Sequence, residues 1–316
     1  MIEIKVIKVI KKFILILIHF DYQTILENML QKIKQFIILG RFNSPTGALL
    51  LAWPCTWGIA MAKPNLIYLI YFSLILIFGS FIMRAAGCAW NDILDRHIDK
   101  KTSRTKNRPI AAGNLSVAEG ILFIFILLCI GFLILINLPT PAIIMSLLSI
   151  PLIIIYPLTK RITFFPQVWL GITFNIGALI GYSCITESYP DISVITLYIG
   201  AIFWTVGYDT LYAMQDYNDD LLTGVKSTVI KMHKYSGIFA AFSYIISTII
   251  FSMALLLNDF STLSITIIII LGIWQIMHAI RTKINDTNKF ISGFNKSNIC
   301  GFYIWIVMIV DLYMLN

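Results

Sequence analysis

Two clusters of acidic residues carry most of the chemistry available to this sequence. One lies at residues 91–99 and the other at residues 209–220, and each closes a long apolar segment. A carboxylate next to lipid costs a few kcal/mol or more unless it faces a polar cavity, a partner or a metal. Mg²⁺ takes oxygen ligands and commonly bridges carboxylates to the phosphates of a substrate. The two clusters therefore favour diphosphate chemistry inside a membrane.

Both clusters keep helical spacing. Asn91, Asp95 and Asp99 recur at every fourth residue, which places them on one face of a helix. In the second cluster, intervals of seven and four residues predict one face as well. A solvated acidic loop is the alternative, but such loops rarely keep helical register. The predicted Mg²⁺ ligands are Asn91, Asp92, Asp95, Asp99, Asp209, Asp216 and Asp220.

Lys and Arg side chains follow both clusters, where they would stabilise the negative charge that develops on a departing diphosphate. Membrane topology is an alternative explanation for any single loop cation. Arg84 differs because it lies inside an apolar segment, seven residues before Asn91, where a cation without a function is costly. The loop candidates for diphosphate binding are Lys106, Arg108, Lys160, Arg161 and Lys226.

The composition is that of an integral membrane protein. Of the 316 residues, 58% are hydrophobic and 13% are charged, whereas soluble domains are roughly half apolar and about a quarter charged. The formal net charge of +8 comes from basic residues in short loops between apolar runs, a pattern that indicates topology rather than nucleic-acid binding. The five cysteines are scattered without metal-type spacing, which favours buried small side chains over disulfides or a zinc site.

The apolar runs predict an all-α bundle of about nine transmembrane helices. The predicted spans are residues 45–62, 66–90, 117–137, 139–157, 166–184, 192–215, 235–257, 260–280 and 294–314. The loops between them alternate, because one set is rich in Lys and Arg and the other has Lys63 as its one basic residue. The positive-inside rule then places the N-terminus and both acidic clusters on the cytoplasmic side.

Residues 1–40 are expected to form an interfacial or poorly ordered extension, and residues 41–316 a single transmembrane domain. The run Phe13–Ile18 follows four lysines and is shorter than the roughly 20 residues that a span needs. No small-residue cleavage site follows it, which disfavours a signal peptide. Met29 is an alternative start, since the well-patterned sequence begins just after it.

The polar residues that follow the apolar segments form several motifs. The motifs read Asn91-Asp92-x-x-Asp95-Arg96-x-x-Asp99, then Arg104-Thr105-Lys106-Asn107-Arg108-Pro109, then Tyr156-Pro157-x-x-Lys160-Arg161 with Pro166-Gln167, and finally Tyr208-Asp209-Thr210-x-Tyr212-Ala213-Met214-x-Asp216 with Lys226-Ser227-Thr228. These motifs resemble those of the UbiA superfamily of intramembrane prenyltransferases, in particular its branch that acts on 4-hydroxybenzoate. The resemblance covers nearly everything from Arg41 to the C-terminus. Two independent motifs at the proper spacing make the resemblance specific.

The resemblance implies a helical bundle around a central cavity that opens to lipid. The implied reaction transfers a polyprenyl chain from polyprenyl diphosphate to the carbon ortho to the hydroxyl of 4-hydroxybenzoate, with Mg²⁺ as cofactor, in ubiquinone biosynthesis. The implied location is a bacterial inner membrane, or the mitochondrial inner membrane in a eukaryote, with membrane lipid as a partner and no nucleic acid. The sequence does not give the length of the prenyl chain.

The resemblance also implies roles for individual residues. Asp95 and Asp209 are the catalytic candidates, with Asp209 assisting the phenol. Arg41 and Arg161 are candidates for binding the carboxylate of the acceptor. The complete set of implied substrate-binding residues is Lys106, Arg108, Lys160, Lys226, Arg41, Arg161, Tyr156 and Tyr212.

The sequence departs from the family pattern at a few positions. Asn43 stands where the branch usually has Asp, Thr159 where Met is frequent, and Asn175 where an aromatic residue is common. Gln215, Tyr217 and Asn218 replace Val-Arg-Asp in the second motif. No predicted metal carboxylate is lost, but the missing arginine at 217 leaves the aromatic acceptor open.

Three other functions compete with this interpretation. Another member of the superfamily would transfer to haem, homogentisate or a naphthoate. An ion-coupled transporter would place its carboxylates near the membrane midplane on broken helices, whereas these clusters lie at the ends of spans. A CDP-alcohol phosphotransferase would need an Asp-Gly pair that this sequence lacks.

Overall fold

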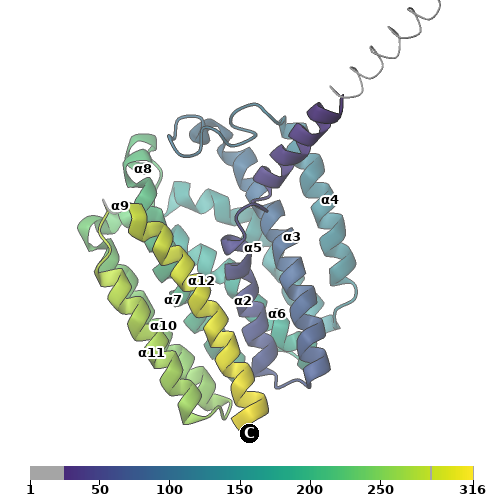
Figure 1. The fold of residues 1–316 in the computed structure, drawn as a ribbon, viewed down its shortest axis with the longest axis vertical. Coiled ribbons are helices and arrows are strands. Elements are labelled where there is room, and N and C mark those ends of the chain that lie inside the picture. The colour runs from purple at the N-terminus through teal and green to yellow at the C-terminus, as the bar shows by residue number, and fades with distance from the viewer. Residues whose placement is uncertain (1–24, 285–286, 316) are drawn as a thin grey trace, which may run out of the picture.

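The computed structural model describes residues 25–284 and 287–315, and this part of the chain is built from helices (Figure 1). A helix over residues 25–39 comes first. The helices that follow are α2 (Thr46–Met61), α3 (Leu66–Asp99), α4 (Val117–Leu135), α5 (Thr140–Ile162), α6 (Pro166–Thr186), α7 (Ile192–Ala213), α8 (Tyr217–Thr223), α9 (Thr228–Met232), α10 (Ser236–Leu257), α11 (Thr262–Ile280) and α12 (Thr287–Val310). Short turns of other helical types are η1 (Met214–Asp216), η2 (His233–Tyr235) and η3 (Asp311–Leu315).

Eight helical segments of the described chain are long and apolar enough to cross a membrane. The ninth expected span corresponds to α2, which has 16 residues and is therefore shorter than the others. The predicted all-helical membrane bundle is confirmed. The predicted interfacial segment around Phe13–Ile18 lies outside the described residues.

Helix α2 occupies the middle of the bundle, where it packs against α3, α6, α7 and α12. Small residues bring α2 and α6 close together, as in many membrane helix pairs. A Cβ atom added at Gly58 would lie 1.9 Å from the carbonyl oxygen of Ala178, and one added at Gly181 would lie 2.1 Å from that of Cys55. The two backbones can approach this closely because glycine stands at both contacts.

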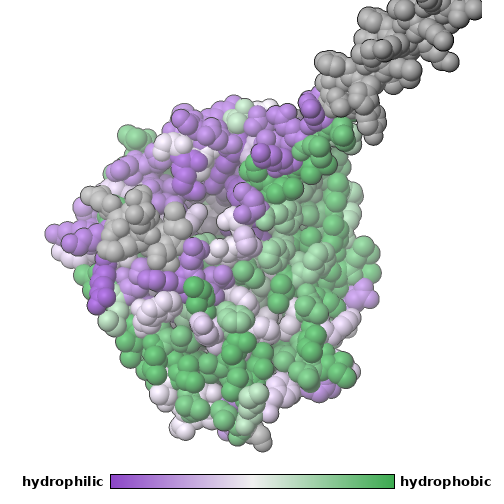
Figure 2. Space-filling model, in the orientation of Figure 1, coloured by the Kyte–Doolittle hydropathy of each residue, from purple (hydrophilic) through white to green (hydrophobic). Residues whose placement is uncertain are grey.

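The outside of the bundle divides into a polar end and an apolar belt (Figure 2). Helix α4 shows why the belt faces lipid, since large side chains such as Ile121, Leu122 and Phe125 are more than half exposed on it. The polar end carries the loop between α3 and α4 and the short helices α8 and α9, and the C-terminal end of α12 lies at the opposite end (Figure 1). Both acidic clusters therefore lie at one end of a membrane bundle.

The two clusters differ in local structure. Helix α3 continues for 34 residues to Asp99, so the first cluster is helical throughout, as predicted. The second cluster is interrupted, because α7 ends at Ala213 and the 3₁₀ turn η1 intervenes before α8. A 3₁₀ turn has three residues per turn. Asp209, Asp216 and Asp220 therefore do not lie on one continuous α-helix, and their common face stays a prediction.

Candidate active site

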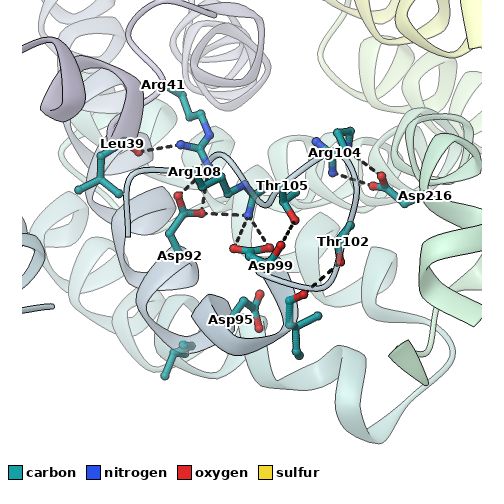
Figure 3. Close-up of polar contacts among 12 residues, drawn as sticks. Leu39, Arg41, Asp92, Asp95, Asp99, Thr102, Arg104, Thr105, Arg108 and Asp216 are labelled. Carbon is teal, nitrogen blue, oxygen red and sulfur yellow. Dashed lines mark hydrogen bonds and ion pairs between the residues drawn. The ribbon is translucent and has the colours of Figure 1, made fainter. Parts of the chain in front are cut away.

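The carboxylates of the first cluster are buried although they follow a membrane span. Asp92 and Asp95 are each 1% exposed and Asp99 is 5% exposed, whereas Asn91 is half-buried. Buried carboxylates need charged or hydrogen-bonding partners. The loop that follows α3 folds back over the cluster and supplies part of them (Figure 3).

Two arginines hold Asp92 (Figure 3). Arg41 Nη2 donates to both carboxylate oxygens of Asp92 at 2.9 and 2.8 Å, and Arg108 Nη1 donates to Asp92 Oδ1 at 3.0 Å. Arg41 has a φ of 58°, and this left-handed residue ends the helix over residues 25–39. Arg108 also reaches Asp99, at 3.0 Å from Oδ2. A loop after α3 and the turn before α2 are thus joined at one carboxylate.

Asp95 is paired with the end of α5. Lys160 Nζ forms an ion pair with Asp95 Oδ2, and Arg161 Nη2 lies 3.5 Å from Asp95 Oδ1. Arg161 also donates to the carbonyl oxygen of Leu94 at 3.2 Å. The structure therefore brings two predicted diphosphate-binding residues directly onto a predicted catalytic carboxylate.

The two clusters are connected across the site by the loop after α3. Arg104 donates from Nε and Nη2 to the two oxygens of Asp216 at 2.6 and 2.7 Å, and Ser103 Oγ donates to Asp219 at 2.8 Å. Partial burial works to lower the pKa of Arg104, but the hydrogen bond and charge of Asp216 outweigh it and raise that pKa. Arg104 therefore keeps its positive charge at a position between the two acidic clusters. It was not among the predicted site residues, although it stands within the quoted basic motif.

A deeper group of residues surrounds Asp209. Asp209 lies on α7 and is half-buried, and the charges that act on it come from Arg84 and Asp216. Tyr156 of α5 interacts electrostatically with both Arg84 and Asp209. Tyr208 and Tyr212 interact in the same way with Arg84. This second layer lies below the ion pairs and places a cation, a carboxylate and phenol rings together.

Arg84 itself has an unusual environment. Its guanidinium lies 5.3 Å from the centre of the Phe174 ring, a cation–π distance. Its buried Nε has no hydrogen-bond partner among the described residues. A Cβ atom added at Gly47 would lie 3.1 Å from Arg84 Nε, so glycine leaves room for the side chain there. An unused buried donor on a cation is a feature of a site that binds an anion.

Three predicted substrate-binding residues lie at the border of the site. Lys226 Nζ donates to the carbonyl oxygen of Ile162 at 3.1 Å and lies 5.5 Å from the centre of the Phe164 ring. Lys106 is exposed in the loop after α3. Tyr212 packs on Phe294, with ring centres 4.5 Å apart, and Arg104 lies 5.9 Å from the centre of the Tyr212 ring. These side chains border the site and are not joined to its carboxylates.

The donor set can be compared with the needs of a divalent metal. In the part of the chain that the structure describes, no three His, Cys, Asp or Glu side chains are grouped closely enough to hold a metal ion. Mg²⁺ does not need such a cage, because it commonly takes one or two carboxylates and completes its shell with substrate phosphates and water. Carboxylate and amide oxygens from two facing segments fit that mode of binding.

Comparisons with known proteins place the chain in a family. Residues 51–299 match the model of the UbiA prenyltransferase family. The chain is 36% identical over 278 residues to a 4-hydroxybenzoate octaprenyltransferase of Haemophilus ducreyi, covering 87% of this chain and 99% of that protein. It is 45% identical over 208 residues to a mitochondrial 4-hydroxybenzoate polyprenyltransferase of Aedes aegypti, covering 65% of this chain and 47% of that protein. The chain spans about half the length of the first curated relatives it matches.

Solved structures show the same fold. A UbiA homologue from Aeropyrum pernix K1 superposes with a TM-score of 0.66 at 20% identity, covering 83% of this chain and 97% of that one. A UbiA homologue from Archaeoglobus fulgidus, bound to GPP and Mg²⁺, superposes with a TM-score of 0.65 at 17% identity, covering 87% of this chain and all of the other. Taken with the matched residues 51–299, the comparisons show that this chain belongs to the UbiA prenyltransferase family.

Proposed function

We propose that the chain transfers a polyprenyl chain from polyprenyl diphosphate to the ring carbon ortho to the hydroxyl of 4-hydroxybenzoate and releases diphosphate, a reaction that supplies ubiquinone biosynthesis. The observation that carries the proposal is the meeting of two acidic clusters with Arg and Lys side chains at one end of an apolar bundle. The names of the relatives from Haemophilus ducreyi and Aedes aegypti support the choice of acceptor.

The diphosphate is bound where the ion pairs now lie. Lys160, Arg161 and Arg108 each hold a carboxylate and can turn to the oxygens of a diphosphate, which offers a second anion at the same place. Lys106 and Lys226 border the site and add positive charge. As the bond between the allylic carbon and oxygen breaks, the leaving diphosphate gains negative charge, which these cations stabilise.

Mg²⁺ is the proposed cofactor. Asn91, Asp95 and Asp99 of the first segment and Asp209, Asp216 and Asp220 of the second would hold it, with Asp92 also holding Arg41 and Arg108. When bound, the ion would neutralise the diphosphate and act as a Lewis acid on its oxygens. UbiA homologues from Archaeoglobus fulgidus have been solved with bound Mg²⁺ and with bound Cd²⁺, which supports the use of a divalent metal.

The acceptor is bound in the deeper layer. Arg84 offers an unused Nε donor to the carboxylate of 4-hydroxybenzoate, while Arg41 is already bound to Asp92 and Arg161 to Asp95. The charge of Arg84 acts on Asp209, and Asp209 takes a proton from the phenol as the ring carbon attacks the allylic cation. The proton on the ring carbon of the new bond then passes to water, and Asp209 returns its proton to the oxygen, which restores the aromatic phenol with the net release of one proton.

The proposed location is an inner membrane, bacterial or mitochondrial, with the active end on the side of the basic loops. A long isoprenoid is insoluble in water, so a site at the end of a lipid-facing bundle can receive it from the bilayer. The apolar belt of Figure 2 is consistent with this route.

A direct assay tests the function. Membranes that contain the chain are incubated with labelled 4-hydroxybenzoate, polyprenyl diphosphate and Mg²⁺, beside an Asp95→Ala, Asp216→Ala double variant. A labelled lipid-soluble product that needs Mg²⁺ and is lost in the variant is expected. No product from a folded, membrane-inserted wild type would overturn the assignment, and haem, homogentisate and naphthoate acceptors would be tested next.

A further inference from the structure

The segment that follows the second acidic cluster lies against the junction of α5 and α6. Gly224, with a φ of 70°, ends α8 and turns the chain toward α9. The backbone N–H of Lys226 then donates to the carbonyl oxygen of Lys160 at 2.9 Å. A backbone hydrogen bond thus joins the end of α5 to the segment between α8 and α9, next to the basic side chains of the site.

Hydrogen bonds from Thr228 to the side chain of Gln167 hold the segment before α9 in place. Gln167 is the second residue of α6 and is 3% exposed, and Thr228, which begins α9, is fully buried. Gln167 Oε1 accepts from Thr228 Oγ1 at 2.5 Å and from the Thr228 backbone N–H at 3.3 Å. Both donors are buried. Without Gln167 Oε1, the backbone N–H and the hydroxyl of Thr228 would therefore have neither a protein acceptor nor water as a hydrogen-bond partner.

The contact has consequences on both sides of the junction. Lys160 and Arg161, in the last turn of α5, reach Asp95 of the first cluster. Ser227 is the residue before Thr228, and its side chain caps α9 by accepting from Ile230 N at 3.3 Å and interacts with Asp220 of the second cluster. Displacement of Thr228 would therefore move Lys226 and Ser227 together relative to Lys160.

We propose that Gln167 is a positioning residue that fixes the spacing between Lys160 and Lys226, and so sets the affinity of the site for the diphosphate of the donor substrate. The inference rests on the proposed prenyl transfer. Gln167 acts through Thr228 and does not touch the substrate. Its loss weakens binding of the diphosphate more than it slows the chemical step.

The test uses the full chain in detergent or membranes. Gln167→Leu removes the acceptor, Thr228→Val removes the hydroxyl donor, and Thr228→Ser keeps it. Gln275→Leu is the matched control, because Gln275 is also buried and its amide donates to Ser297 within the α11–α12 pair. Binding of inorganic diphosphate with Mg²⁺ is measured by thermal shift, and KM for polyprenyl diphosphate and kcat are measured at saturating acceptor.

We expect Gln167→Leu and Thr228→Val to raise KM for polyprenyl diphosphate about tenfold, equivalent to about 1.4 kcal/mol, with kcat nearly unchanged. The stabilisation by Mg²⁺ and diphosphate should weaken in parallel, and Thr228→Ser should restore both. Gln275→Leu should lower the melting temperature without changing KM. If Gln167→Leu does not fold, the comparison of Thr228→Val with Thr228→Ser decides.

Two results would overturn the inference in distinguishable ways. An unchanged KM in the Thr228→Val variant, with a wild type that binds diphosphate normally, removes the positioning role and leaves the proposed function intact. A wild type that binds neither inorganic diphosphate nor polyprenyl diphosphate in the presence of Mg²⁺ removes the proposed function and the inference with it.

Discussion

Arg84 combines a cationic charge, depth in the bundle and an unused hydrogen-bond donor. Its position on α3 is seven residues before Asn91, within the apolar part of the helix. Its guanidinium lies over the ring of Phe174, Tyr156 and Tyr208 interact with it electrostatically, and its charge acts on Asp209. A cation in this setting fits the proposed acceptor, which is flat, aromatic and negatively charged at one end.

Replacement of Arg84 tests this selectivity. In Arg84→Gln the loss of a charged hydrogen bond, about 1.5–3 kcal/mol, should raise KM for 4-hydroxybenzoate roughly 10- to 100-fold. KM for polyprenyl diphosphate should stay within about twofold, since the ion-paired layer is untouched. The measurement is steady-state prenyl transfer in membranes with each substrate varied in turn.

A neutral acceptor provides the control for that prediction. 4-Hydroxybenzamide has the same ring and hydroxyl but lacks the carboxylate, so the wild type should prefer 4-hydroxybenzoate and Arg84→Gln should not. An Arg84→Gln variant that keeps the wild-type preference would show that another cation binds the carboxylate. Arg41 and Arg161 would then be the next candidates.

Among the helices, α2 and α6 depend on close approach of their backbones. Gly58→Ala would push a methyl group into the carbonyl of Ala178, and overpacking of this kind costs about 1–3 kcal/mol. We expect Gly58→Ala to lower the melting temperature in detergent. Gly87→Ala is the control, because a Cβ atom at Gly87 meets nothing within 4 Å and alanine favours the helix. Equal melting temperatures for the two variants would contradict a tight α2–α6 contact.

The start of α7 depends on Asp191. Asp191 Oδ1 accepts from the backbone N–H groups of Ser193 and Val194 at 3.0 and 3.1 Å. Burial works to raise the pKa of Asp191, but the hydrogen bonds from Ser193, Val194 and Tyr182 outweigh it and lower that pKa. A carboxyl group whose pKa is lowered on folding contributes stability above its unfolded pKa of about 3.9, and the contribution is lost as the pH falls through the folded pKa.

Asp191→Ala should therefore destabilise the protein by about 1 kcal/mol at neutral pH. The difference in melting temperature between wild type and Asp191→Ala should be constant from about pH 5 to 7 and shrink below about pH 4. Asp191→Asn should keep most of the stability at pH 7, because an amide oxygen also caps a helix. A difference that grows as the pH falls would contradict the assignment.

The sequence predicts helices better than it predicts their partners. Apolar length predicted the spans, and four-residue spacing predicted that Asn91, Asp95 and Asp99 share a helix, because both signals are local. The contact of Arg41 with Asp92 joins residues 51 positions apart, and that of Arg104 with Asp216 joins residues 112 apart. No local pattern encodes such pairs. The 3₁₀ turn at Met214–Asp216 was also missed, since no proline or glycine marks it.

At the scale of the whole molecule, several acidic side chains at the end of the bundle that holds the candidate site are paired with basic side chains of the same chain. Asp92, Asp95, Asp99 and Asp216 each pair with an arginine or lysine from another segment, so buried charge is compensated before a substrate arrives. Removing one partner of a buried ion pair is costly because it leaves the other charge unpaired. If the basic side chains instead bind a diphosphate while the carboxylates bind its metal, every charge still has a partner of opposite sign. The same cations can therefore stabilise the folded protein and bind the donor substrate.

The distribution of these cations also predicts how the bundle sits in the membrane. The loops after α3 and α11 and the last turn of α5 carry basic residues at the end that holds both acidic clusters. The loop between α6 and α7 carries Glu187 and Asp191 at the other end. In a bacterial host, the basic end should face the cytoplasm.

Cysteine labelling tests this orientation. Lys101→Cys and Ser188→Cys, two exposed positions in these loops, are introduced into a Cys129→Ser background and treated with a membrane-impermeant maleimide. Lys101→Cys should label in inside-out vesicles and Ser188→Cys in right-side-out vesicles. The reverse pattern would place the site on the outer face, where a polyprenyl diphosphate made in the cytoplasm could not reach its carboxylates without first crossing the bilayer.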